Sequence, residues 1–421
     1  MDIGFGPVGG VGGVGGVGGV GGVGGVGGVG GVGGVGGVGG VGGVGGVGGV
    51  GGVGGVSGVG AGLSPLGMNA LISARDGIVG TWVSPGAAAP LHPMEHETGW
   101  SRTLALWAPG PRAAAVDFEL HLRLGFSAIQ DGSGKSGFAV WHAELTAGSG
   151  LQPPTVDYQP LVSMVRPGDA VFLDQIDFLA NYSELRSERA TEIVAQLGAP
   201  NAFLGAIARL DGERTPRTLE FLAAVLRLAG TVSQRFKASL AVRRPVEYSP
   251  QVQPMIGSPG HGSLPSGHAT EAFAAAVAFG ELLGETGLDP YRDRLYREQL
   301  MRLASRIAIN RTVAGVHFPV DSAAGCALGL ALGRYAVARM KGSAGGASAS
   351  YDAWMFDGSR YPLRSGGTDT DFRWRDQFDV AANAQTGTAD GSITHAGTQT
   401  LDEPGSAILK WMWDRAGEEW T

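Results

Sequence analysis

The sequence contains a single cysteine, Cys326, so a disulfide within the chain is impossible and cysteine usage indicates no redox compartment. Charged residues are also scarce, at 16%, and the net charge of −7 gives no basic field for a nucleic acid or an anionic membrane surface. Long apolar runs are missing as well, because Glu271, Glu281 and Arg334 interrupt the most apolar segments before they reach the ~20 residues of a membrane-spanning helix. We therefore expect neither a nucleic-acid nor a membrane partner.

The first residues lack the basic segment and compact apolar core of a signal peptide, so the sequence leaves the compartment undetermined. Glycine, in contrast, is abundant, and much of it lies in a Val-Gly-Gly repeat over residues 8–60. A helical glycine costs about 1 kcal/mol relative to alanine. We therefore expect residues 1–62 to form a disordered arm.

Residues 63–170 give mixed signals, and we expect short strands and loops there. The stretches 78–83 and 115–120 predict two of these strands. The glycine- and serine-rich stretch 132–136 resembles the end of a phosphate-binding loop, but Ile129 stands where the first glycine is required. We interpret that stretch as a turn.

Apolar residues recur at helical spacing from residue 171 onward, in a segment that opens near 181 and in the segments 217–242, 270–283, 291–309 and 320–340. We predict an all-α fold in which a helical bundle over 171–342 forms the catalytic domain and strands are minor. Residues 343–421 follow a glycine-rich linker, and we expect this tryptophan-containing tail to pack on the bundle or on a partner subunit.

Three short clusters between Lys237 and Asp321 hold the residues that most strongly indicate chemistry. Taken singly, an arginine or lysine is usually solvated and a histidine is more often structural than catalytic. Taken together in order, the clusters supply cations, a hydroxyl, a glycine N–H and two imidazoles, which suits one tetrahedral oxyanion. The clusters are Lys237 with Arg244-Pro245, then Pro265-Ser266-Gly267-His268, and finally Arg311, His317 and Asp321.

The second cluster directly precedes the apolar segment that begins at Ala269, and a helix N-terminus attracts anions through its free N–H groups. Ser266 suits the N-cap, and Gly267 allows the backbone to approach a ligand closely. His268 is then available as a general acid or base.

His317 and Asp321 are four residues apart, a spacing that places both on one helical face. The carboxylate can then hold the imidazole Nδ1–H, so that Nε2 is presented as a metal ligand or a nucleophile. Lys237 and Arg244 are predicted two turns apart on one helix. Arg244 and Arg311 can each give forked hydrogen bonds to an oxyanion.

These clusters resemble the superfamily of type 2 phosphatidic acid phosphatases and vanadium-dependent haloperoxidases, over the 85 residues from Lys237 to Asp321 and their helical surroundings. The resemblance implies a helical bundle with one oxyanion pocket. It implies that His317 is the vanadium ligand, or the phosphorylated nucleophile of a phosphatase, and that Asp321 orients it. The implied oxyanion-binding residues are Lys237, Arg244, Ser266, Gly267, His268 and Arg311, with His268 as the acid or base.

The motifs also resemble those of bacterial haloperoxidases, which implies bound vanadate, hydrogen peroxide and halide as reactants, and a small organic acceptor. Lys237 would polarise the peroxide. His261 occupies the position of a histidine in bromoperoxidases of the family, so bromide or iodide is favoured, although His261 taken alone is equally well a loop histidine. Family members often assemble, and we expect a homo-oligomer.

The alternative is a soluble acid phosphatase that acts through a phosphohistidine at His317. The short intervals from Lys237 to His268 and from His268 to Arg311 favour this branch, as does Gln234, where the peroxidases often have tryptophan. A non-enzymatic oxyanion-binding protein is a third possibility. The intact Lys237, His268 and His317 argue against it.

Overall fold

The computed structural model describes residues 74–75, 77–78, 81, 104–130, 136–146, 151, 153–198, 200–289, 291, 293–342, 348–364, 369–401 and 405–421. The predicted arm and most of the predicted turn at 132–136 lie outside these residues. The chain divides into two units, residues 1–112 and 113–421. Helix α5 (Pro109–His121) begins in the first unit, and the elements that follow belong to the second.

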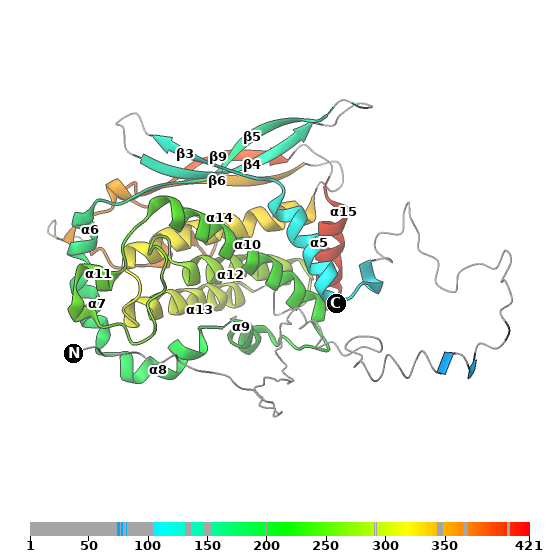
Figure 1. Ribbon diagram of the computed structural model, residues 1–421, viewed down its shortest axis with the longest axis horizontal. Helices are drawn as coiled ribbons and strands as arrows, with labels where there is room; N and C mark the ends of the chain where they lie inside the picture. The colour runs from blue at the N-terminus through cyan, green and yellow to red at the C-terminus, as the bar shows by residue number, and fades with distance from the viewer. Residues whose placement is uncertain are drawn as a thin grey trace. The chain divides into compact units, whose positions relative to one another are not determined.

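Helices dominate the second unit (Figure 1). Helix α14 has 21 buried residues among its 23, which explains why its sequence shows no polar face. It packs against α12 and α10, and α13 packs against α12. The helices are α6 (Asp169–Asp174), α7 (Ile176–Ser183), α8 (Arg186–Ala195), α9 (Asn201–Ala208), α10 (Pro216–Leu240), α11 (Pro245–Tyr248), α12 (Gly267–Glu285), α13 (Arg294–Val313), α14 (Pro319–Lys341) and α15 (Ala407–Glu418).

Three glycines at four-residue intervals bring α14 into close contact with α12. A Cβ at Gly325 would lie 2.7 Å from the Ser266 carbonyl oxygen, and one at Gly329 would lie 2.4 Å from the Thr270 carbonyl oxygen. Gly333 repeats the pattern one turn further along. Side chains at these positions would push the helices apart, so the glycines fix the N-terminus of α12 beside the first turns of α14.

A five-stranded sheet covers this helical layer, in the order β3-β4-β5-β6-β9 (Figure 1). Strands β3 (Leu124–Gln130), β4 (Ser136–Thr146) and β5 (Thr155–Val165) pair antiparallel, and β6 (Ala349–Asp357) pairs antiparallel with β9 (Ile393–Leu401). β5 and β6 are parallel, with Val162 opposite Trp354. The sheet therefore joins chain segments from before and after the helices.

The predicted all-α fold is wrong, because helices make up 56% and strands 17% of the described residues and the fold is mixed α/β. The described part of 219–343 is helix and loop, whereas the sheet is built by the flanking segments. The strand predicted at 115–120 is also wrong, because these residues lie in α5. Of the stretch 78–83 the structure describes only Ile78, which is helical, and Thr81.

The C-terminal segment returns to the bundle. Helix α15 packs against α10 and α14, and Trp413 meets Phe221 of α10 with ring centroids 5.6 Å apart. A short two-stranded sheet, β7 (Phe378–Asp379) with β8 (Ala384–Gln385), precedes β9. Among the described residues, no helix is long and apolar enough to span a membrane.

Candidate functional site

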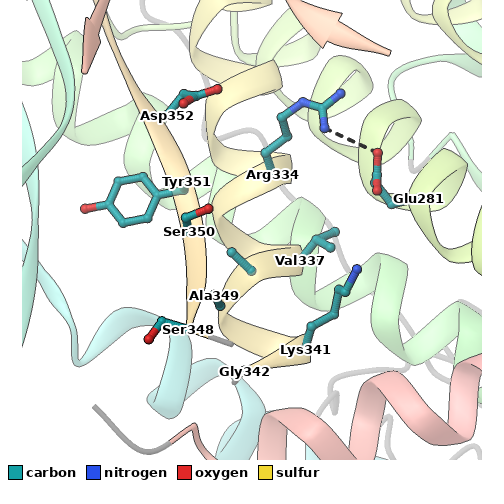
Figure 2. Close-up of a pocket in the computed structure, with 11 residues that line it drawn as sticks. Glu281, Arg334, Val337, Lys341, Gly342, Ser348, Ala349, Ser350, Tyr351 and Asp352 are labelled. Atoms are coloured by element: carbon teal, nitrogen blue, oxygen red, sulfur yellow. Dashed lines mark hydrogen bonds and ion pairs between the residues drawn. The ribbon is translucent and has the colours of Figure 1, made fainter. Parts of the chain in front are cut away.

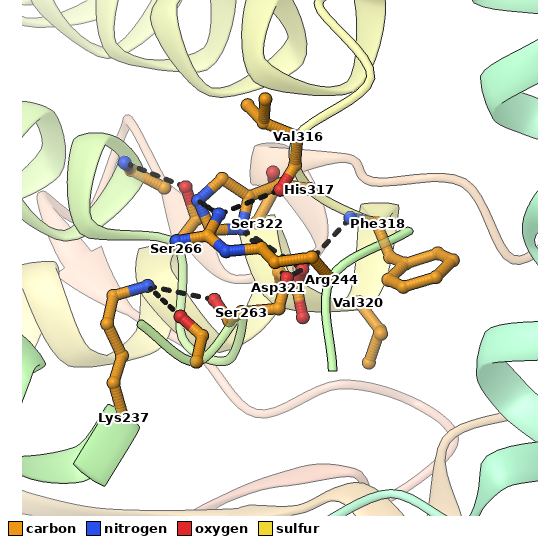
Figure 3. A network of polar contacts seen from close by, with 12 residues as sticks. Lys237, Arg244, Ser263, Ser266, Val316, His317, Phe318, Val320, Asp321 and Ser322 are labelled. Atoms are coloured by element: carbon orange, nitrogen blue, oxygen red, sulfur yellow. Dashed lines mark hydrogen bonds and ion pairs between the residues drawn. The ribbon is translucent and has the colours of Figure 1, made fainter. Parts of the chain in front are cut away.

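The three sequence clusters meet in one polar network at the ends of four long helices (Figure 3). Lys237 lies in the last turn of α10, Arg311 in the last turn of α13, and Asp321 in the first turn of α14. Ser266 is the N-cap of α12, and its backbone N–H donates to the Asp321 carbonyl at 2.9 Å. Arg244 departs from the prediction, because α10 ends at Leu240 and Arg244 is instead the N-cap of α11.

His317 is held from its Nδ1 side. Nδ1 lies 3.1 Å from Asp321 Oδ2, and the same carboxylate oxygen accepts hydrogen bonds from the Phe318 N–H at 2.9 Å and from the Ser263 hydroxyl. An acceptor at Nδ1 places the proton there, so Nε2 carries the lone pair. Nε2 lies 3.1 Å from Arg244 Nη1, so His317 faces the cations with an unprotonated nitrogen.

The electrostatics of this pair agree with its geometry. Burial, and then Lys237 and Arg244, lower the pKa of His317 well below its usual value, so the imidazole is neutral. Burial raises the pKa of Asp321 to about 6, against the lowering effect of the hydrogen bond from Ser263. At neutral pH the site therefore has an ionised Asp321 that orients a neutral His317.

The cations are buried and donate mainly to carbonyl and amide oxygens. Lys237 Nζ donates to the carbonyls of Ser263 at 2.9 Å and Gly262 at 3.2 Å. Burial, with Arg244 second, lowers the pKa of Lys237 to about 7. Burial also lowers the pKa of Arg311 to about 10. Positive charge in a dry site favours a bound anion, which would stabilise the charged forms.

Gln196, the C-cap residue of α8, contacts both Arg311 and His268. Arg311 Nη2 donates to Gln196 Oε1 at 3.1 Å, and His268 Nε2 lies 3.0 Å from the Gln196 carbonyl. Arg311 Nη1 is 3.5 Å from the same imidazole nitrogen, and the buried Arg311 Nε has no hydrogen-bond partner among the described residues. Burial and then Arg311 lower the pKa of His268 to about 4.

His261 contacts Arg244, which in turn contacts His317. Its Nδ1 lies 3.0 Å from Arg244 Nη2, and its Nε2 lies 3.4 Å from the side-chain nitrogen of Gln234. His261 is exposed, unlike His317. Arg244 therefore connects an exposed imidazole at the rim with the buried imidazole at the centre.

A pocket of about 380 Å³ opens beside His268. Glu271, one turn further along α12, also lines it, and burial raises the pKa of this carboxyl to about 7 although Lys237 acts to lower it. A Cβ built on Gly267 would lie 3.8 Å from both Glu271 Oε2 and Lys237 Cε. The Glu271 wall of the pocket thus lies close to Lys237 at the N-terminus of α12.

A second pocket, also of about 380 Å³, lies between α14 and β6 (Figure 2). Its charged residues are paired: Arg334 Nη1 lies 3.3 Å from Glu281 Oε1, and Lys341 is in an ion pair with Glu285. Nothing from the three sequence clusters lines this pocket.

The sequence reasoning missed Ser263, Gln196 and Glu271. Ser263 lies just before the second cluster, and its hydroxyl and carbonyl bind Asp321 and Lys237. Gln196 acts partly through its backbone, so its side-chain type gives no signal. Glu271 could have been noticed, because a carboxylate three residues after His268 lies on the same helical face.

A comparison with protein families agrees with the clusters. Residues 219–343 match the family model described as the PAP2 superfamily. A comparison with curated proteins gives no match. Among solved structures, the chain is similar to the crystal structure of the first transmembrane PAP2 type phosphatidylglycerolphosphate phosphatase from Bacillus subtilis. That likeness has 20% identity and a TM-score of 0.23, and it covers 39% of this chain and 77% of the other. Residues 219–343 form a PAP2 superfamily domain.

Proposed function

We propose that this domain is an enzyme that binds a tetrahedral oxyanion against Nε2 of His317, and that its oxyanion is vanadate, used to oxidise bromide or iodide with hydrogen peroxide. The observation that carries the proposal is the neutral, buried His317, whose Nε2 points at Arg244 while Asp321 holds Nδ1. A lone pair directed into a cationic enclosure suits a bond to the central atom of an oxyanion.

The residues present fit such a group. Lys237, Arg244 and Arg311 all lie close enough to His317 for their positive charges to lower its pKa. The Arg311 Nε provides a buried donor without a partner among the described residues. Ser266 and the Gly267 N–H lie at the start of α12, where backbone donors are available. The described residues contain no cluster of three or more His, Cys, Asp or Glu side chains that could hold a metal ion, so His317 would be the single protein ligand.

Each side chain then has a distinct task. Bound vanadate would supply the Lewis acidity that activates peroxide toward a halide. Lys237, Arg244 and Arg311 would neutralise charge on the oxyanion, and Asp321 would keep the His317 tautomer fixed. His268 would accept or donate a proton at the face of the site that opens to the pocket.

Vanadate loading tests the proposal. Protein incubated with orthovanadate should retain vanadium through gel filtration and should brominate a phenol reporter in the presence of peroxide and bromide. His317→Ala should lose both properties. Retention of vanadium by His317→Ala would contradict the assignment of His317 as the ligand, independently of any activity.

The rim histidine gives a second test within the proposed function. His261 contacts Arg244 and is exposed, so His261→Phe should change the bromide-to-chloride rate ratio while vanadium retention is unchanged. His395→Phe, on exposed β9, is the matched control. An unaltered ratio would remove His261 from halide selection.

A phosphatase is the second candidate, and the pocket beside His268 favours it. In that reaction Nε2 of His317 would attack phosphorus, and the bond from phosphorus to the ester oxygen would break. His268 would protonate the departing oxygen, whose organic group would lie in the pocket. Hydrolysis of p-nitrophenyl phosphate, inhibited by vanadate and without halide oxidation, would favour this candidate over the peroxidase.

A further inference from the structure

Glu271 is a half-buried carboxyl that the oxyanion chemistry above does not use. It lies in α12 between two glycines: a Cβ on Gly230 of α10 would be 3.5 Å from Glu271 Oε2, and one on Gly267 would be 3.8 Å away. The effects on its pKa come from burial and from the charge of Lys237, with no hydrogen bond from the described residues. Because this half-buried carboxyl lines a pocket and receives no hydrogen bond from the described residues, it is available to a ligand that enters the pocket.

The pocket around Glu271 has apolar walls. Leu197, Leu226, Ala272 and Ile307 line it together with His268 and Glu271. Apolar walls with a few convergent polar groups are typical of a small-molecule site. The pocket therefore suits an organic group of a few carbons that carries one polar end.

The charges around the pocket indicate which polar group the bound organic molecule carries. Arg227 also lines the pocket, but Asp117 neutralises it through hydrogen bonds of 2.6 and 3.0 Å. His268 is neutral, and Lys237 is directed at the carbonyls of Gly262 and Ser263. Among the described residues that line the pocket, Glu271 is thus a carboxyl with neither an ion pair nor a hydrogen bond, and a cationic group of a ligand would provide both.

We propose that the pocket is a subsite for the organic group attached to the bound oxyanion, and that Glu271 recognises a protonated amine on that group. The inference rests on the proposed oxyanion site in its phosphatase form, in which the oxyanion carries an organic group. Gly267 places Glu271 and the oxyanion-binding Lys237 within contact of the same position. A molecule in which a short carbon chain joins an amine to the oxyanion can therefore bind the oxyanion site and Glu271 at the same time. Glu271 is in this account a specificity-determining residue.

Isothermal titration calorimetry of the full chain tests the inference without turnover. The probes are inorganic phosphate, ethylphosphonate and 2-aminoethylphosphonate, which share the oxyanion and differ in the amine. Wild-type protein should bind the amine-bearing probe roughly tenfold more tightly than ethylphosphonate, the value of one charge-assisted hydrogen bond. Glu271→Gln should lose this preference while it still binds phosphate.

The matched control is Glu285→Gln, which removes the same charge from the same helix at a site outside the pocket and should keep the preference. Equal affinity of wild-type protein for the two phosphonates overturns the subsite, whatever the variants do. So does an undiminished preference in Glu271→Gln. Failure of wild-type protein to bind phosphate overturns the oxyanion site itself, which is a separate result.

Discussion

Each of the two pockets of about 380 Å³ is lined by a glutamate of α12, and the pockets differ in whether that glutamate is paired. In the pocket of Figure 2, Glu281 is paired with Arg334 and accepts a hydrogen bond from Asn383 at 2.6 Å. In the pocket beside His268, Glu271 has no such partner among the described residues and lies next to the cationic cluster. Volume does not distinguish the two pockets, whereas charge compensation does.

Side chains without an ion-pair partner thus gather at the proposed oxyanion site, whereas those of the other pocket are paired. The same contrast holds for the arginines: Arg334 faces a carboxylate, but Arg311 donates to a carbonyl and an amide oxygen. Polar groups that a fold leaves incompletely compensated are the ones available to a ligand. Matched substitutions in the two regions test this conclusion.

The largest expected effect follows removal of the central imidazole. His317→Ala should lower the activity of the domain, whether bromination or phosphate-ester hydrolysis, by at least about 10³-fold, because the group that bonds to the oxyanion is gone. Circular dichroism should show that the fold is retained. His395→Ala, which removes an exposed imidazole of β9, should change activity less than about twofold by the same assay.

Exchanging the arginines for lysine should separate the two regions. Arg311→Lys keeps the charge but loses the planar fork and its buried Nε donor, so activity should fall by about 10²-fold. Arg334→Lys retains an ion pair with Glu281 and should leave activity unchanged. Equal losses in both variants would show that the cationic cluster has no special role.

Asp321 should matter less than His317, since it acts through the imidazole. Asp321→Asn removes the acceptor for Nδ1–H and allows the wrong tautomer, which should cost about 10- to 100-fold in activity or vanadium affinity. Ser263→Ala, which removes a donor to the same oxygen, should cost less. An Asp321→Asn variant with unchanged affinity and activity would contradict the orienting role.

The pKa of Lys237 predicts how anion affinity depends on pH. Burial and Arg244 lower it to about 7, so the free lysine is charged below that pH and loses its charge above it. Sulfate, which does not titrate here, should therefore bind up to about tenfold more weakly as pH rises through this range. Glu271 titrates nearby and disfavours anions in the same direction, so Lys237→Met should flatten the profile only in part.

The site was more predictable from the sequence than the fold. Lys237, His268 and His317 were identifiable because their chemistry requires particular residue types at fixed spacing. The contacts from Gln196 and Ser263 were not, since backbone carbonyls carry much of them and any residue provides a carbonyl. Motif spacing therefore predicts the side chains that the structure brings together more readily than the backbone groups that hold them in place.

The sheet escaped prediction for a physical reason. The pairing of β5 with β6 joins residues such as Val162 and Trp354, with the whole helical segment between them, and sequence periodicity detects only local structure. β9 is also mostly exposed, so its threonine-rich sequence lacks an apolar alternation. Residues 115–120 alternate in the manner of a strand, but the alanines before them favour the helix that α5 forms.

The smallest expected effect compares the two glutamates in stability. The pKa of Glu271 is raised to about 7 from 4.5, so the folded state binds a proton that the unfolded state has released, and stability falls as pH rises between these values. Glu271→Gln removes this cost and should raise the free energy of unfolding by about 1 kcal/mol at pH ~8 and by nearly nothing at pH ~4. Glu281→Gln breaks a partly buried pair and should instead lower it by about 1 kcal/mol at pH ~8. Urea unfolding at both pH values measures these changes in the free energy of unfolding. Destabilisation by Glu271→Gln at pH ~8 would show that the fold already compensates this carboxylate. The contrast between the two pockets would then be lost.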